Sequence, residues 1–192
     1  MYTAQTFDHL LGTPGFSDKA LQTHFTLYQG YVTNTNKLHD ELKKLADADQ
    51  LATPHFAEMK RRLGWEFNGM RLHELYFGNM INGGKQLAAG SPLYNKITKD
   101  FGTFDHWQKE FQATGSARGI GWAILYHDKL ADKLFNVWIN EHDVGHFAGA
   151  TPVLIMDVFE HAFFLDYGTK RADYIAAFMK AIDWTKVDQR LV

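Results

Sequence analysis

The feature that most constrains the fold is an apolar repeat of three to four residues that begins just after Ser17. Large side chains recur from Leu21 through Tyr28 and Tyr31 to Leu45. This spacing matches one face of an α-helix, and the Ser17 hydroxyl can accept a hydrogen bond from a free amide of the first turn. The pattern therefore predicts one long amphipathic helix whose buried face carries polar as well as apolar side chains.

A second apolar stripe follows the break at "DADQLATP". From Pro54, apolar side chains recur at helical spacing as far as Phe77, with His73 among them. Two long helices with a short connection are most simply an antiparallel hairpin. "NGGKQLAAGSP", residues 82–92, is the best candidate for a boundary, because glycine, proline and serine favour a loop. We expect a helical hairpin domain at residues 1–84 and a mixed α/β domain at residues 85–192.

The second half of the chain has shorter patterns. "GWAILYH" and "KLFNVWIN" are typical of two strands joined by a turn, and "PVLIM" is a third apolar run that could pair with them. "FDHWQKEFQATGSA" and "RADYIAAFMKAIDW" are amphipathic and predict helices. The expected fold class is α+β, with a small antiparallel sheet flanked by helices.

Composition excludes several classes of function. A net charge of −2 gives no electrostatic footprint for nucleic acid or for an anionic membrane. The absence of cysteine excludes disulfides, zinc–thiolate sites and thiol catalysis. No apolar run approaches the roughly 18 residues of a membrane span. We therefore expect a soluble, cytoplasmic protein without a nucleic-acid or membrane partner.

The chain has ten histidines, and any metal site must combine imidazole with carboxylate, a set that suits iron, manganese, zinc and copper. In "MDVFEHAFFLDYG", Asp157 and His161 lie four residues apart, with Glu160 beside the histidine. That pair alone is weak evidence, because Asp157 could simply cap a helix. His24 and His73, however, each occupy the apolar stripe of a different helix. Three imidazoles and one carboxylate leave room for a solvent ligand, and fit a hydrolytic zinc centre or a redox iron or manganese centre.

Four segments of the chain resemble those of a known family. "DVFEHAFFLDYGTKRADYIAAFMKAIDW" is similar to the C-terminal signature of the iron/manganese superoxide dismutases. "HFTLYQGYVTNTNKL", "MRLHELYF" and "FGTFDHWQKEFQATGSARGIGWAIL" resemble other family segments in the same order, so the resemblance spans residues 17–184. It implies a helical hairpin followed by a three-stranded antiparallel sheet with helices. It also implies conversion of two superoxide anions to O2 and H2O2 by alternate reduction and oxidation of a mononuclear iron or manganese centre.

The resemblance assigns roles by position. It places the metal ligands at His24, His73, Asp157 and His161, with one iron or manganese ion per subunit and use of both metals left open. Tyr31 matches a tyrosine at the substrate entrance, and Trp122 matches a tryptophan that lines the pocket. Glu160 matches a glutamate that reaches across a dimer interface to the last histidine ligand of the other subunit. A homodimer is expected, with a tetramer as the alternative.

The departures from the family pattern concern the pocket. The separation of His24 and Tyr31 is one residue shorter than the common family spacing, and seven residues is a regular helical separation. Tyr28 and Phe164 replace the histidine and tyrosine that often meet at the gateway. Three further positions replace tryptophans and make the pocket wall less bulky: Phe77, Ile124 and Phe159.

The residue that hydrogen-bonds the metal-bound solvent also differs. The family usually supplies a glutamine from one of two places. Four residues before His73 this chain has Gly69, which is too small for the task, whereas "NEHDVGH" aligns His142 with the other glutamine. We expect His142 to take this role, with His146 as the fallback. The simplest competing interpretation is that His142 is a loop histidine in solvent.

The sequence is compatible with three functions. The first is a superoxide dismutase with superoxide as its small-molecule substrate. The second is a mononuclear zinc hydrolase with the same ligand types, although the ligand segments show no spare carboxylate to serve as a general base. The third is a protein that keeps the fold and holds a metal without turnover.

Overall fold

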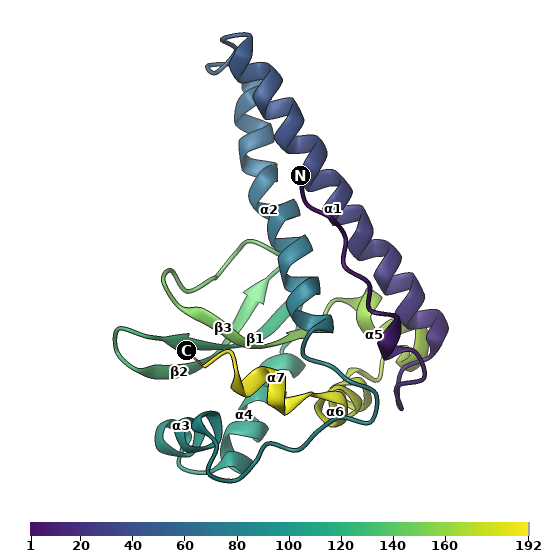
Figure 1. Ribbon diagram of the computed structural model, residues 1–192, viewed down its shortest axis with the longest axis vertical. Helices are drawn as coiled ribbons and strands as arrows, with labels where there is room; N and C mark the ends of the chain where they lie inside the picture. Colours follow the sequence, from purple (N-terminus) through teal and green to yellow (C-terminus); the bar gives the residue numbers. More distant parts are fainter. Residues whose placement is uncertain (192) are drawn as a thin grey trace.

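The computed structural model describes residues 1–191, and its N-terminal part is a long helical hairpin (Figure 1). After a short 3-10 turn, η1 (Asp8–Leu10), helix α1 covers Asp18–Asp47 and helix α2 covers Pro54–Phe77. The Ser17 hydroxyl accepts a hydrogen bond from the Ala20 amide, as expected for an N-cap, and Thr53 caps α2 in the same way. The predicted hairpin is confirmed.

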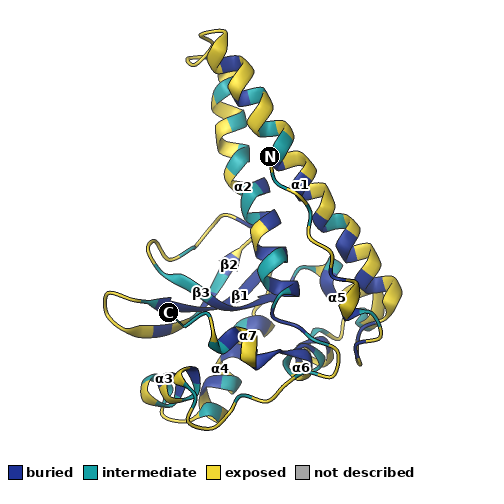
Figure 2. Cartoon of the chain, in the orientation of Figure 1, coloured by how far each residue is buried: buried dark blue, intermediate teal, exposed yellow. Residues whose placement is uncertain are grey.

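The hairpin projects from the rest of the molecule as an arm. Figure 2 shows mostly exposed residues at its free end and buried residues where its base meets the sheet. The ligand-bearing part of each helix is this buried base, because His24 lies in the first half of α1 and His73 near the end of α2. The antiparallel arrangement brings these two positions to the same level.

The sheet has three antiparallel strands in the order β2-β1-β3. They are β1 (Gly121–Asp128), β2 (Lys133–Asn140) and β3 (Thr151–Asp157). Both expected strands are present, and the apolar run "PVLIM" pairs with β1 as the third. The first seven residues of β1 are buried, which shows that both faces of this central strand are covered.

Helices complete the second half of the chain, which confirms the α+β class. They are α3 (Pro92–Phe101), α4 (Phe104–Ser116), α5 (Glu160–Tyr167), α6 (Arg171–Ala181) and α7 (Trp184–Asp188). The sheet lies between the base of the hairpin and the group α3, α4, α6 and α7, whereas α5 lies at the foot of α1 (Figure 1). Helix α3 was not expected from the sequence, although Ser91 caps it and Pro92 opens it.

The strand register determines where polar side chains meet. Trp122 pairs with Ile139 of β2 on one side and with Asp157 of β3 on the other. The start of β1 and the end of β3 therefore lie at one end of the sheet. A bridge between Asn140 and Val144 opens the loop after β2 at the same end. Residues far apart in sequence thus converge at this end of the sheet.

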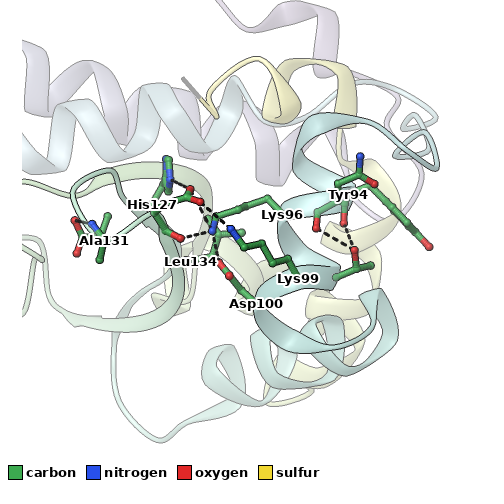
Figure 3. Close-up of polar contacts among 11 residues, drawn as sticks. Tyr94, Lys96, Lys99, Asp100, His127, Ala131 and Leu134 are labelled. Atoms are coloured by element: carbon green, nitrogen blue, oxygen red, sulfur yellow. Dashed lines mark hydrogen bonds and ion pairs between the residues drawn. The ribbon is translucent and has the colours of Figure 1, made fainter.

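A charged cluster fixes the other end of the sheet (Figure 3). The buried Lys96 ammonium of α3 lies 2.9 Å from Asp100 Oδ2 and 3.2 Å from Asp132 Oδ1 in the β1–β2 turn. Lys99 Nζ is 3.0 Å from Asp132 Oδ2, and His127 Nε2 is 3.3 Å from Asp132 Oδ1. The two lysines hold the pKa of Asp132 below its ordinary value. These contacts tie the turn to α3.

One apolar core connects the two halves of the chain. Its buried side chains run from Phe7 to Val187 without separating into two clusters. The division into domains 1–84 and 85–192 stays a prediction. Within residues 1–191, no helix is both long enough and apolar enough to cross a membrane.

Candidate metal centre

Four elements each supply one metal-binding side chain. The residues are His24 of α1, His73 of α2, Asp157 at the end of β3 and His161 of α5, and their ligand atoms all lie within 4.8 Å of one another. The first three are buried, and the His161 side chain keeps 27% of its surface exposed. The structure therefore brings together the four residues that were predicted from the sequence to bind a metal.

The three imidazoles converge on one carboxylate oxygen. Asp157 Oδ2 lies 3.2 Å from His24 Nε2, 3.6 Å from His73 Nε2 and 3.2 Å from His161 Nε2. All three histidines thus present the same ring nitrogen to a common centre. Three nitrogens and one oxygen around a point are a donor set that a divalent or trivalent transition metal accepts.

His24, His73, Asp157 and His161 form a cage of ligand atoms, and two of these atoms lack a hydrogen-bond partner within residues 1–191. The Nε2 atoms of His24 and His73 are buried and have no hydrogen-bond partner among the described residues. His73 Nδ1 lies 2.5 Å from the carbonyl oxygen of Gly69, which can only accept, so Nδ1 carries the ring proton and Nε2 has a free lone pair. Such a hydrogen bond is how a protein orients an imidazole ligand. The residues present fit a metal ion.

The protonation states suit a cation. Burial lowers the pKa of His24 and lowers the pKa of His73 still further below the ordinary value. Burial alone would raise the pKa of Asp157, but the adjacent His161 and His24 imidazoles favour the ionised carboxylate and bring that pKa below its ordinary value. Neutral imidazoles beside an ionised carboxylate are the forms that bind metals.

Asp157 belongs to the strand and does not cap a helix. The residue at the N-cap of α5 is Phe159, which has no side-chain capping bond. The Phe159 amide donates to Asp157 Oδ1 at 2.9 Å, and the Tyr174 hydroxyl donates to the Asp157 carbonyl oxygen at 2.6 Å. The helix-cap interpretation of Asp157 is therefore wrong. These bonds fix Oδ1 and the main chain, and leave Oδ2 to the histidines.

Aromatic rings enclose the ligands. The pairs and their centroid distances are Phe77–His24 4.9 Å, Trp122–His73 5.1 Å, Tyr31–His73 5.2 Å and Phe159–His161 5.0 Å. Phe77, Trp122 and Ile124 are fully buried. The cage therefore lies in a water-poor environment, which strengthens the electrostatic interactions inside it.

His142 lies inside the protein next to this cage. It is fully buried, so the interpretation of His142 as a solvated loop residue is wrong. Its Nε2 lies 2.8 Å from Tyr31 Oη, and the Trp122 indole donates to its Nδ1 at 3.1 Å. Burial lowers the pKa of His142 to about 4 and raises the pKa of Tyr31. Three residues predicted separately thus form one hydrogen-bonded chain.

His146, the fallback for the role of His142, bonds other groups. Its Nδ1 is 2.6 Å from the hydroxyl of Tyr126, and its Nε2 is 2.8 Å from the carbonyl oxygen of His142. Both ring nitrogens are therefore occupied by these partners. His146 holds the main chain of the loop that carries His142.

The gateway positions differ in their surroundings. Tyr28 is fully buried, its hydroxyl donates to Glu74 Oε1 at 2.9 Å, and it accepts from the Gln5 amide at 2.9 Å. It therefore ties α1 to α2 and to the N-terminal segment. Glu160 and Phe164 are exposed on α5, with Phe164 at 56%.

The sequence analysis missed Trp65. Its ring centroid lies 4.6 Å from that of His142 and 5.6 Å from that of Tyr31. Its indole donates to Glu141 Oε2 at 3.1 Å, so it connects α2 to the His142 loop. Trp65 lies eight residues before His73, about two helical turns, and this spacing was the signal that it faces the same side.

Comparison with known proteins shows which family has a chain of this kind. The family model for the C-terminal domain of iron/manganese superoxide dismutases matches residues 89–190. The manganese superoxide dismutase 2 of Haloferax volcanii is 35% identical over 172 residues, which cover 89% of this chain and 84% of the relative. The chain belongs to the iron/manganese superoxide dismutase family.

Other relatives of this superoxide dismutase are named for iron. The enzyme of Sulfolobus acidocaldarius is 33% identical over 184 residues, 93% of this chain and 86% of the relative. That of Cupriavidus metallidurans is 36% identical over 181 residues, 92% and 88% of the two chains. The protein is thus a superoxide dismutase that binds an iron or manganese ion through His24, His73, Asp157 and His161. This rejects the zinc hydrolase and the non-catalytic alternative, and leaves the choice between the two metals open.

Proposed function

We propose that this superoxide dismutase converts two superoxide anions to O2 and H2O2 with Tyr31 and His142 as the hydrogen-bonding pair of its pocket. The observation that carries the proposal is the Tyr31–His142 contact of 2.8 Å beside a cage of three imidazoles and one carboxylate. A bound iron or manganese ion supplies the change of oxidation state that the reaction needs. The remaining tasks belong to the protein.

Both members of the pair are uncharged near neutral pH. Because burial raises the pKa of Tyr31, its hydroxyl stays protonated, and because the pKa of His142 is about 4, its imidazole stays neutral. The pair therefore adds no charge of its own, and the Tyr31 hydroxyl can donate a hydrogen bond to an anion. Formation of H2O2 consumes two protons, and the Tyr31 hydroxyl is the group placed to pass them on.

The pocket wall has a separate task. Trp122, Phe77 and Phe159 face the ligand rings, and Tyr28 braces the helix that carries His24. Their bulk limits the pocket to small molecules and keeps the cage dry. Replacing Phe77 by alanine is expected to admit water and to lower metal affinity, because a large buried ring is removed.

We also propose a homodimer formed through α5. Supporting this, Phe164 and Leu165 expose 56% and 50% of their surfaces on this short helix, and Glu160 is exposed beside the partly exposed His161. Glu160 would then accept a hydrogen bond from His161 of the partner subunit. Sedimentation equilibrium of the wild type and Phe164→Glu tests this, with dissociation expected in the variant. A tetramer in the wild type would require a second interface.

Metal analysis of the purified protein, followed by superoxide assays of iron-loaded and manganese-loaded forms, tests the function. Tyr31→Phe is expected to keep the metal and lose turnover. Zinc occupancy without superoxide turnover in any form would contradict the proposal. The cytoplasmic location and the boundary at residues 82–92 are further proposals, tested by cell fractionation and by limited proteolysis.

A further inference from the structure

The indole of Trp122 determines which nitrogen of His142 carries a proton. An indole N–H can only donate, and the Trp122 Nε1 lies 3.1 Å from His142 Nδ1. Nδ1 must therefore be the unprotonated, accepting nitrogen. A neutral imidazole has one N–H, so that of His142 lies on Nε2.

The direction of the next hydrogen bond follows. His142 Nε2 lies 2.8 Å from Tyr31 Oη, and an Nε2–H must donate there, so the tyrosine oxygen is the acceptor. A doubly protonated ring would set two N–H donors against each other at Trp122. The lowered pKa of His142 agrees with the exclusion of that form.

The ring cannot escape this arrangement by turning over. Its centroid lies 4.7 Å from that of Phe159 in a stacked contact, and 4.6 Å from that of Trp65 in an edge contact. The side chain is fully buried. Rotation by half a turn would place ring carbons opposite Trp122 and Tyr31 and would break both hydrogen bonds.

We propose that Trp122 is a positioning residue that fixes His142 in its Nε2-protonated tautomer, so that Tyr31 alone keeps a proton to donate into the pocket. The inference deepens the proposed function and rests on it for its catalytic meaning. Both nitrogens of His142 are occupied, so the ring has no N–H left for a solvent ligand. Among residues 1–191, the Tyr31 hydroxyl bonds His142 alone and accepts in that bond, which leaves its own O–H unused. A glutamine at the position of His142 would differ, because its side-chain amide has two N–H groups to donate and an oxygen that accepts, whereas a neutral imidazole has a single N–H.

The tautomer can be measured without turnover. Two-bond proton–nitrogen correlation spectra of the protein loaded with Zn2+, a closed-shell ion for the same ligands, report which ring nitrogen of His142 is protonated. The variant Trp122→Phe keeps an aromatic ring and removes the donor. Trp107→Phe is a matched control, because Trp107 is also fully buried and donates its indole proton, to Asn136 Oδ1 at 3.0 Å, away from the cage.

In the wild type and in Trp107→Phe, we expect only the Nε2-protonated pattern. In Trp122→Phe, we expect this single pattern to be lost, because Tyr31 can then either accept from His142 or donate to it. An Nδ1-protonated or doubly protonated ring in the wild type would overturn the proposal, and so would an unchanged pattern in Trp122→Phe. Absence of superoxide turnover with the expected tautomer would instead refute the proposed function alone.

Discussion

Gly69 offers a sharp test of how the pocket is packed. A Cβ atom built at this position would lie 2.6 Å from Cδ1 and 2.7 Å from Cε1 of the Tyr31 ring. Contacts this short require the ring to move, and the ring is held by its hydrogen bond to His142 and its stacking on His73. Gly69→Ala is therefore expected to displace the Tyr31 side chain.

The magnitude follows from two opposing effects. Alanine in place of glycine in a helix interior stabilises by about 1 kcal/mol. Overpacking a buried site costs about 1–3 kcal/mol. Gly69→Ala should thus range from neutral to about 2 kcal/mol less stable than wild type. Gly64→Ala in the same helix is the matched control, because nothing lies within 4 Å of its added Cβ, and it should be about 1 kcal/mol more stable.

Urea denaturation of the metal-free wild type and the two variants measures the difference. We expect Gly64→Ala to exceed Gly69→Ala by about 1–3 kcal/mol in the free energy of unfolding, because only the second variant meets the ring. The superoxide assay should show a loss in Gly69→Ala and none in Gly64→Ala. Equal stability gains in both variants would refute the packing argument.

Three further results are expected. Lys96→Met should destabilise by about 3 kcal/mol, since it leaves the buried Asp100 carboxylate without a cation and with only the Leu134 amide as its partner among the described residues. Lys99→Met at the exposed end of the cluster should cost under about 1 kcal/mol, and thermal unfolding compares the two variants. Burial lowers the pKa of His142 from 6.5 to about 4, so the unfolded chain binds more protons between these values. In the metal-free protein, His142 should therefore contribute a loss of about 3 kcal/mol of stability as pH falls from 6.5 to 4, in addition to the losses from His24 and His73. His142→Gln should remove that part of the slope in urea titrations at several pH values, and an unchanged slope would argue against the burial. Metal at about 100 times its Kd should stabilise the protein by about 2.7 kcal/mol, and calorimetry should find most of this gain missing in His161→Ala.

The helical part of the fold was predictable because its signals are local. Ser17 caps α1, and His24 and His73 lie on apolar stripes whose helical period fixes the side that they face. The resemblance to a known family then joined these two histidines to Asp157 and His161. Strand pairing did not enter that step, because His24 and His73 each lie in one of the segments that resemble the family, and Asp157 and His161 share another.

The hydrogen bonds around His142 were not predictable in the same way. They depend on the register that sets Trp122 opposite Asp157 and on the loop geometry after β2. Register and loop conformation are long-range properties, and a sequence pattern with a period of two or of 3.6 residues does not encode them. Helix α3 was missed for a different reason, because it has only ten residues and begins at the end of the glycine-containing segment that was assigned to a loop.

The arrangement of the cage also limits when it can form during synthesis. His24 and His73 emerge from the ribosome early, whereas Asp157 and His161 follow only after the strands β1 and β2. Contacts of such large sequence separation form late in folding, after the loops between them have closed. A nascent hairpin therefore offers only two of the four ligands and holds a metal poorly. The protein therefore binds its ion when synthesis and folding are nearly complete, and the metal ions present in the cell at that stage determine which ion it takes.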